Sequence, residues 1–216
     1  MIKETSIENQ KMLAEKMKYT SEYAINFDDR IIQLYGDLTD EIGPILRIKY
    51  ELLKQWVKNV EGVDLKEITL DISSFGGDIY SIFSAFDFFH ELKLNGVLVN
   101  TRAHGICMSA ATVLLAGGTG RRYALPYCRF MLHDVQVEGI GGTANQVQHT
   151  ARTISNEQME LFSFYAKFAR RGEEDWTEKE LKTEAKKWHK KYTKDGVDNY
   201  LSAKEVLELK LIDEIL

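Results

Sequence analysis

A serine lies where a β-rich run meets a helical one, and this position suits nucleophilic chemistry. Residues 97–101 have β character, and the stretch 103–116 ends in a helix-compatible run of alanine, valine and leucine, with Ser109 at the junction. The hydroxyl of a serine there lies near unpaired N–H groups and partial positive charge, which stabilise a developing anion. The same residue also fits a simpler role as a helix cap. The G-x-S-x-G pattern of hydrolases is absent.

Two more residues could complete a catalytic set with Ser109. His133 ends a short β run, and Asp198 lies in a late loop. Nucleophile, base and orienting acid are the three roles that acyl transfer needs. Spacing does not show that these side chains converge, and His104 and Asp134 are alternative candidates. A lone histidine at a strand end also often has a structural role.

A glycine pair marks a second turn at which the backbone could contact a ligand. Gly76 and Gly77 follow an alternating strand pattern and precede a helical pattern that starts at Ile79. Glycines allow backbone N–H groups to face a ligand without an obstructing side chain. The pair is equally compatible with a plain strand-to-helix turn.

Composition excludes several classes of protein. The chain has 216 residues, 44% hydrophobic and 28% charged, which predicts one domain with a sizeable core. A net charge of -5 argues against a nucleic-acid partner. Two cysteines make neither a disulfide framework nor a metal cluster, and a reducing compartment fits best. We expect no membrane span and no signal peptide, because no apolar run is long enough and residues 1–18 are polar.

Strand and helix patterns alternate along the chain, which predicts an α/β fold. The predicted strands cover 30–36, 68–72, 97–101, 121–125 and 129–133, and the predicted helices 41–60, 79–92, 143–171 and part of 206–216. In the helix 41–60 we expect the apolar face to contain Ile45, Ile48, Leu52, Trp56 and Val57. Residues 1–26 are polar and predict a mobile arm or a short helix. The charged stretch 172–198 predicts solvated helices at the edge of the domain.

The helix 143–171 carries a long apolar stripe, and the glycine-rich segment 139–142 before it could form an edge strand. The stripe consists of Val147, Ala151, Ile154, Leu161, Phe162, Tyr165 and Phe168. Such a stripe predicts a partner surface, unless the helix packs wholly on its own core.

Several motifs in order resemble those of ClpP, the proteolytic subunit of the Clp protease. They are Ser73-Ser-Phe-Gly-Gly-Asp, Gly105-Ile-Cys-Met-Ser-Ala-Ala, Arg121-Arg-Tyr-Ala-Leu-Pro126, Met131-Leu-His133 and Tyr200-Leu-Ser-Ala203 with Leu211-Ile-Asp213. The resemblance covers roughly residues 27–216. It implies the ClpP/crotonase fold, a repeated β-β-α spiral core with a protruding handle helix. It also implies a self-compartmentalised serine endopeptidase, with no cofactor or metal, that cleaves unfolded polypeptides inside two stacked heptameric rings, a tetradecamer. An ATP-dependent AAA+ unfoldase of the Clp type would feed it.

The resemblance assigns roles to particular residues. Ser109 matches the nucleophile, His133 the general base and Asp198 the acid that orients the histidine. The backbone N–H groups of Gly77 and Ala110 match the oxyanion hole. The implied organisation is an arm over 1–26 and one peptidase domain over 27–216, with a handle at about 139–171 and a charged insertion at about 172–194.

Departures from the family pattern indicate a divergent member, phage-encoded or organellar. Phe75 replaces the usual proline before the glycine pair, Ala110-Ala111 replaces Met-Gly after the nucleophile, and Asp134-Val135 replaces Gln-Pro after the histidine. The interval from His133 to Asp198 is longer than usual. Two other functions stay open: a catalytically silent ring subunit, or a crotonase-like acyl-thioester enzyme. The expected location is the cytoplasm of a bacterial or phage-infected cell, or an organelle matrix or stroma.

Overall fold

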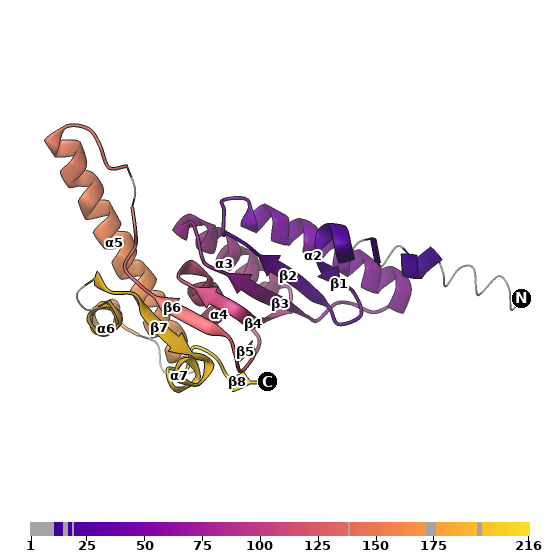
Figure 1. The fold of residues 1–216 in the computed structure, drawn as a ribbon. Coiled ribbons are helices and arrows are strands. Elements are labelled where there is room, and N and C mark those ends of the chain that lie inside the picture. The colour runs from indigo at the N-terminus through magenta and orange to yellow at the C-terminus, as the bar shows by residue number, and fades with distance from the viewer. Residues whose placement is uncertain (1–10, 15–16, 19, 138, 172–175, 194–195) are drawn as a thin grey trace, which may run out of the picture.

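The computed structural model describes residues 11–14, 17–18, 20–137, 139–171, 176–193 and 196–216. Strands and helices alternate along most of the chain, as the sequence pattern predicts (Figure 1). The strands are β1 (Ile25–Asn26), β2 (Ile31–Tyr35), β3 (Glu67–Ser74), β4 (Leu98–Met108), β5 (Arg122–Ala124), β6 (Arg129–Leu132), β7 (Asn199–Ser202) and β8 (Glu214–Ile215). The helices are α2 (Ile42–Glu61), α3 (Ile79–Leu94), α4 (Ala110–Ala116), α5 (Ala144–Ala169), α6 (Glu178–Tyr192) and α7 (Ala203–Glu208).

One mostly parallel sheet organises the fold. Its strands follow the order β1-β2-β3-β4-β5-β8, and β1 alone along this path pairs antiparallel with its neighbour. The long strand β4 pairs first with β5 and, nearer its end, with β6, which in turn pairs antiparallel with β7. The C-terminal ends of β4 and β6 and the start of β7 therefore meet in one region. The α/β prediction is confirmed.

Strand β1 lies inside the segment that we predicted as an arm. Ile25 pairs with Ile32 of β2 and is fully buried. Residues 11–14, 17–18 and 20–23 are helical. The rest of the predicted arm lies outside the described residues.

Helix α2 buries a face that overlaps in part with the predicted one. The buried positions include Ile42, Leu46, Tyr50, Leu53 and Val57, which follow helical spacing. Of the predicted set, Val57 is buried, Leu52 and Trp56 are partly buried against the core, and Ile48 is 60% exposed. The prediction of the helix is confirmed, and Ile48 is the predicted position that does not face the core.

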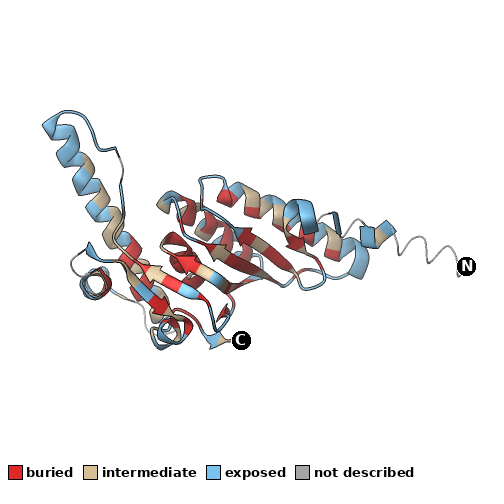
Figure 2. Cartoon of the chain, in the orientation of Figure 1, coloured by how far each residue is buried: buried red, intermediate tan, exposed pale blue. Residues whose placement is uncertain are grey.

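Helix α5 projects from the body at its N-terminal half, which is exposed, whereas its C-terminal half is packed (Figures 1 and 2). Thr143 caps the helix with a reciprocal capping box to Gln146. Residues 139–142 form no strand, so the edge strand predicted there is absent. Three glycines in four residues cost much backbone entropy when they are fixed in a strand.

Helices α5 and α6 pack against each other, and their burial bears on two further predictions. Most residues of α6 are exposed, as expected for a solvated helix at the edge of the domain, and one face, with Ala185 and Tyr192 buried, packs against α5. Phe162 and Tyr165 of α5 are only 0% and 1% exposed in the single chain. They therefore belong to the chain's own core, and the part of the stripe that contains them does not face a second ring.

Candidate active site

Ser109 occupies a strained turn between β4 and α4. Its backbone has φ 53° and ψ -129°, a conformation that L-residues rarely adopt and that costs about 1–3 kcal/mol. The Ser109 N–H donates to the Met131 carbonyl at 2.8 Å, and the Tyr165 hydroxyl donates to the Ser109 carbonyl at 3.3 Å. Strand β6 and helix α5 thus hold this turn from two sides.

His133 and Asp198 lie next to Ser109. The Nε2 atom of His133 is 2.6 Å from the Ser109 Oγ atom, which is a hydrogen-bonding distance. On the other side of the ring, Nδ1 is 3.9 Å from Oδ1 of Asp198, too long for a hydrogen bond. Within the described chain, the buried Nδ1 atom has no hydrogen-bond partner. The structure therefore brings the three side chains together but leaves the carboxylate about 1 Å from hydrogen-bonding range.

The glycine pair lies directly against the Ser109 turn. A Cβ atom at Gly76, where φ is +104°, would be 2.7 Å from the Ser109 Cβ and 2.8 Å from the Met108 carbonyl oxygen. A side chain at this position would displace the serine, so only glycine fits.

Gly77 lines the same cavity as Ser109. The Leu38 N–H donates to the Gly76 carbonyl, and the Leu38 carbonyl accepts from the Asp78 N–H, both at 2.8 Å. Leu38 thus pairs with the backbone on either side of Gly77. Ala110 is the first residue of α4, whose leading N–H groups have no intrahelical acceptor.

The alternative residues have other partners. The Nδ1 atom of His104 lies 3.2 Å from Oδ1 of Asp71. Asp71 also forms a bidentate ion pair with Arg102. Asp134 places Oδ1 2.9 Å from the Nε2 atom of His189 in α6. Neither side chain is hydrogen-bonded to the serine or to His133.

Helix α6 contributes residues to this region that the sequence analysis missed. Trp188 stacks on Tyr165 with ring centroids 5.9 Å apart, and Tyr165 holds the Ser109 carbonyl. His189 contacts both Asp134 and Gln158, and Gln158 accepts from the Val135 N–H at 3.1 Å. Trp188 and Tyr192 are aromatic residues in a charged stretch. They were the sequence signal that this helix packs against the rest of the domain.

A cavity of about 620 Å³ opens beside Ser109. Its lining includes the glycine pair's Gly77, Ala110, His133 and part of α5. A polypeptide segment could therefore reach the hydroxyl and the backbone N–H groups together.

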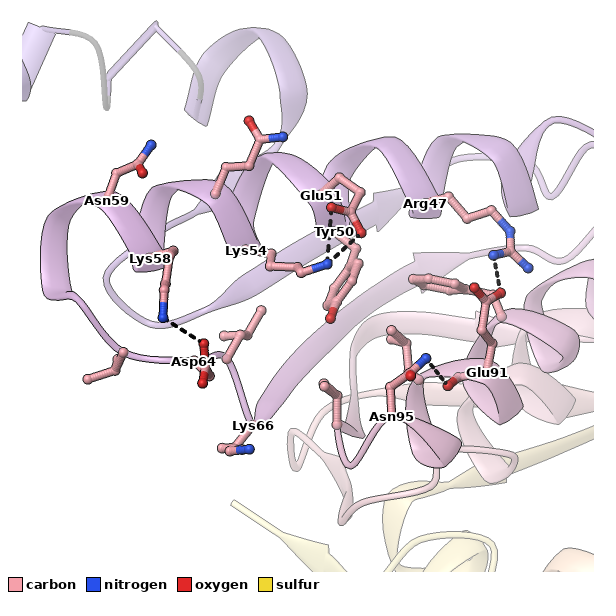
Figure 3. A pocket seen from close by; sticks show the side chains of 16 residues that line it. Arg47, Tyr50, Glu51, Lys54, Lys58, Asn59, Asp64, Lys66, Glu91 and Asn95 are labelled. Atoms are coloured by element: carbon pink, nitrogen blue, oxygen red, sulfur yellow. Dashed lines mark hydrogen bonds and ion pairs between the residues drawn. The ribbon is translucent and has the colours of Figure 1, made fainter.

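A larger hollow, of about 740 Å³, lies elsewhere, between α2 and α3 (Figure 3). Figure 3 shows that its charged side chains pair with one another: Lys54 with Glu51, Lys58 with Asp64, and Arg47 with Glu91. None of the three candidate catalytic residues lines it. Size alone thus does not identify the reactive site.

The described residues include neither a membrane-spanning helix nor a metal-binding cluster. No helix there is long and apolar enough to cross a membrane. In the same part of the chain, no group of three or more histidine, cysteine, aspartate or glutamate side chains could hold a metal ion.

The structure is an α/β protein with a strained strand-to-helix turn at Ser109, and comparisons identify its family. The family model described as Clp protease matches residues 14–216. The chain is 30% identical over 154 residues to the ATP-dependent Clp protease proteolytic subunit of Pleurastrum terricola, covering 70% of this chain and 73% of that protein. It is 32% identical over 152 residues to proteolytic subunit 1 of Thermobifida fusca, covering 70% and 60%. It is 29% identical over 203 residues to proteolytic subunit 1 of Tropheryma whipplei, covering 92% and 86%. The chain belongs to the Clp protease family.

Proposed function

We propose that this chain is a serine endopeptidase in which Ser109 is the nucleophile, His133 the base and Asp198 the acid that orients the base. The observation that carries the proposal is the 2.6 Å contact between Ser109 Oγ and His133 Nε2 at a strained turn. A plain helix-capping serine needs neither the strain nor the histidine. The contact also argues against a silent ring subunit and against a crotonase-like enzyme.

The reaction follows from the positions of the atoms. Ser109 Oγ bonds to the carbonyl carbon of a peptide as its proton passes to His133 Nε2. The N–H groups of Gly77 and Ala110 stabilise the oxyanion, and each such donor contributes about 10²–10³ in rate. The C–N bond then breaks, and His133 gives the proton to the leaving amine. Water cleaves the acyl ester by the same steps in reverse order, with His133 again taking and returning a proton.

Asp198 is proposed to complete the triad by a small approach to His133. With Nε2 free to accept the serine proton, the neutral ring carries its hydrogen on Nδ1, which faces Asp198 at 3.9 Å. Catalytic hydrogen bonds are often long without substrate and shorten in the reactive complex. An approach of about 1 Å would pair the buried Nδ1–H and stabilise the imidazolium.

The assembly and partner are part of the proposal. The relatives named above are subunits of ATP-dependent proteases; by extension, a Clp-type AAA+ unfoldase delivers unfolded chains to this peptidase. We propose two stacked heptameric rings, with the exposed half of α5 as the handle between them. Val147 on that half is 38% exposed, and Val137 and Ile140 before it are each 44% exposed. Negative-stain imaging tests the double ring.

We also propose that the chain is located in a reducing compartment, such as the cytoplasm. Cys107 and Cys128 are free and buried. Burial raises the pKa of the Cys128 thiol to about 12, so it stays protonated and unreactive.

Labelling with a fluorophosphonate probe tests the function directly. The probe forms a covalent bond only with an activated serine. Labelling of the wild type and none of Ser109→Ala supports the proposal. Equal labelling of both would overturn it.

A further inference from the structure

The cavity beside Ser109 is lined by carboxylates without matching cations. Asp78 and Glu157 line it, and its described lining contains no lysine or arginine. His133 is the one basic side chain there, and the proposed mechanism uses it as the base. The cavity therefore presents negative charge to whatever enters it.

Glu157 is the better placed of the two carboxylates to contact a substrate. It lies on α5 between Ile154 and Leu161, at spacings of three and four residues, so the three share one face of the helix. All three line the cavity. Glu157 is half-buried, whereas Asp78 is exposed and caps α3 by accepting from the Tyr80 N–H at 3.1 Å.

A hydrogen bond ties Glu157 to α3, the helix that follows Gly77. The Tyr80 hydroxyl donates to Oε1 of Glu157 and leaves Oε2 available to a ligand. Glu157 also lines the same cavity as Ser109 and Gly77. The carboxylate and the proposed nucleophile therefore border one space.

The remaining walls fit an aliphatic chain. Ile79, Met131, Val135, Ile154 and Leu161 all line the cavity. Lysine and arginine bury aliphatic stems against apolar surface and carry a cation at the end. A cavity with apolar walls and a half-buried carboxylate combines the two properties that such side chains need.

We propose that this cavity selects lysine or arginine at P1, the residue whose carbonyl Ser109 attacks, and that Glu157 recognises the cation. The inference rests on the proposed peptidase function. Glu157 Oε2 accepts from the ammonium or guanidinium group while the apolar walls contain the stem. The substrate class is therefore unfolded polypeptide cleaved after basic residues.

The test compares peptides that differ only at P1, with lysine, norleucine or glutamate, on the full-length chain. Norleucine keeps the lysine stem and lacks the ammonium group. We expect kcat/KM for the lysine peptide to exceed that for norleucine by about tenfold, because the ion pair is partly shielded from water. Glu157→Gln should lower the lysine value by about tenfold and leave the norleucine value within about twofold. Glu157→Lys should shift the preference to glutamate.

Glu160→Gln is the matched control, because Glu160 lies on the same helix but lines a different groove, between α5 and α6. It should keep the wild-type preference. Equal rates for lysine and norleucine in the wild type would overturn the inference, as would an unchanged lysine preference in Glu157→Gln. Fluorophosphonate labelling of the same preparation distinguishes failure of the P1 preference from failure of the proposed peptidase function. A labelled enzyme without a lysine preference refutes the inference alone, whereas no labelling and no hydrolysis of any peptide refutes the proposed function as well.

Discussion

His189, in the last turn of α6, places its Nε2 atom 2.9 Å from Oδ1 of Asp134, the residue that follows His133. The charged segment between His133 and Asp198 thus packs against the backbone that carries His133. After α6, Thr193 donates to the His189 carbonyl through both N–H and hydroxyl, at 2.9 and 2.8 Å, shortly before Asp198. Helix α6 therefore joins the segments that carry both residues.

This relationship predicts that His189 positions the catalytic histidine. His189→Ala should lower kcat several-fold with little change in KM, because the proposed reaction does not use His189 to contact substrate. His189→Gln, which can still hydrogen-bond, should keep more activity. Lys190→Ala, an exposed neighbour, is the control. Steady-state kinetics measure kcat and KM of each variant, and circular dichroism checks that the variants are folded. A wild-type kcat in His189→Ala would contradict the positioning role of His189.

Asp198 and Asp134 should differ sharply on substitution. Asp198→Asn should reduce kcat by at least about 100-fold, because the asparagine favours the wrong histidine tautomer. Asp134→Asn should cost less than about tenfold, because Asp134 contacts His189 and not His133. Rates of peptide hydrolysis for the two variants provide the measurement. The assignment of the acid fails if the order is reversed.

Burial divides helix α5 into a structural half and an exposed half. Phe162→Glu should destabilise the chain by about 3–5 kcal/mol, because Phe162 is 0% exposed and the substitution removes a buried ring and places a charge in the core. Val147→Lys should change stability by less than about 0.5 kcal/mol, but it should lower the mass of the assembly. Chemical unfolding and light scattering measure the two effects. Stable single rings from Phe162→Glu would show that Phe162 faces a second ring after all.

Asp213 should make stability depend on pH in the acid range. Burial opposes its ionisation, but hydrogen bonds from the Arg122 side chain and backbone outweigh burial and lower the pKa of Asp213. In the unfolded chain, an aspartate carboxyl has a pKa of about 3.9. The stabilisation is therefore complete above that pH and is lost as the pH falls through the lower folded pKa.

The measurement is the free energy of unfolding between about pH 5 and pH 2, the range in which a carboxyl with a lowered pKa changes stability. The wild type should lose stability more steeply than Asp213→Asn as the pH falls, because in this range the Asp213 carboxyl takes up a proton when the wild-type chain unfolds, and asparagine does not. Parallel curves for the two proteins would show that Asp213 does not contribute.

The sequence predicted the elements around Ser109 because local signals agreed there. Alternating apolar residues ended at the glycine pair, and a β-rich run changed to small residues at Ser109. The exposed position of Ile48 in α2 could not be predicted, because apolar residues occur on several sides of that helix and both Ile48 and Leu46 fit a stripe of helical spacing.

The role of α6 could not be predicted from the sequence, because it depends on contacts between distant residues. Its charged residues dominate the composition, and the packing of Trp188 on Tyr165 joins residues that are far apart in the sequence. The distances from His133 to Ser109 and Asp198 are also set by strand pairing rather than by spacing.

The most direct test of the account is mass-spectrometric mapping of the fluorophosphonate adduct on the wild-type chain. The account predicts one adduct, on Ser109, at a rate that falls by at least about 100-fold in His133→Ala, because the histidine activates the hydroxyl. Ser109→Ala should give neither an adduct nor peptide hydrolysis. Labelling at another serine, or labelling of Ser109 at the same rate without His133, would contradict the central claim.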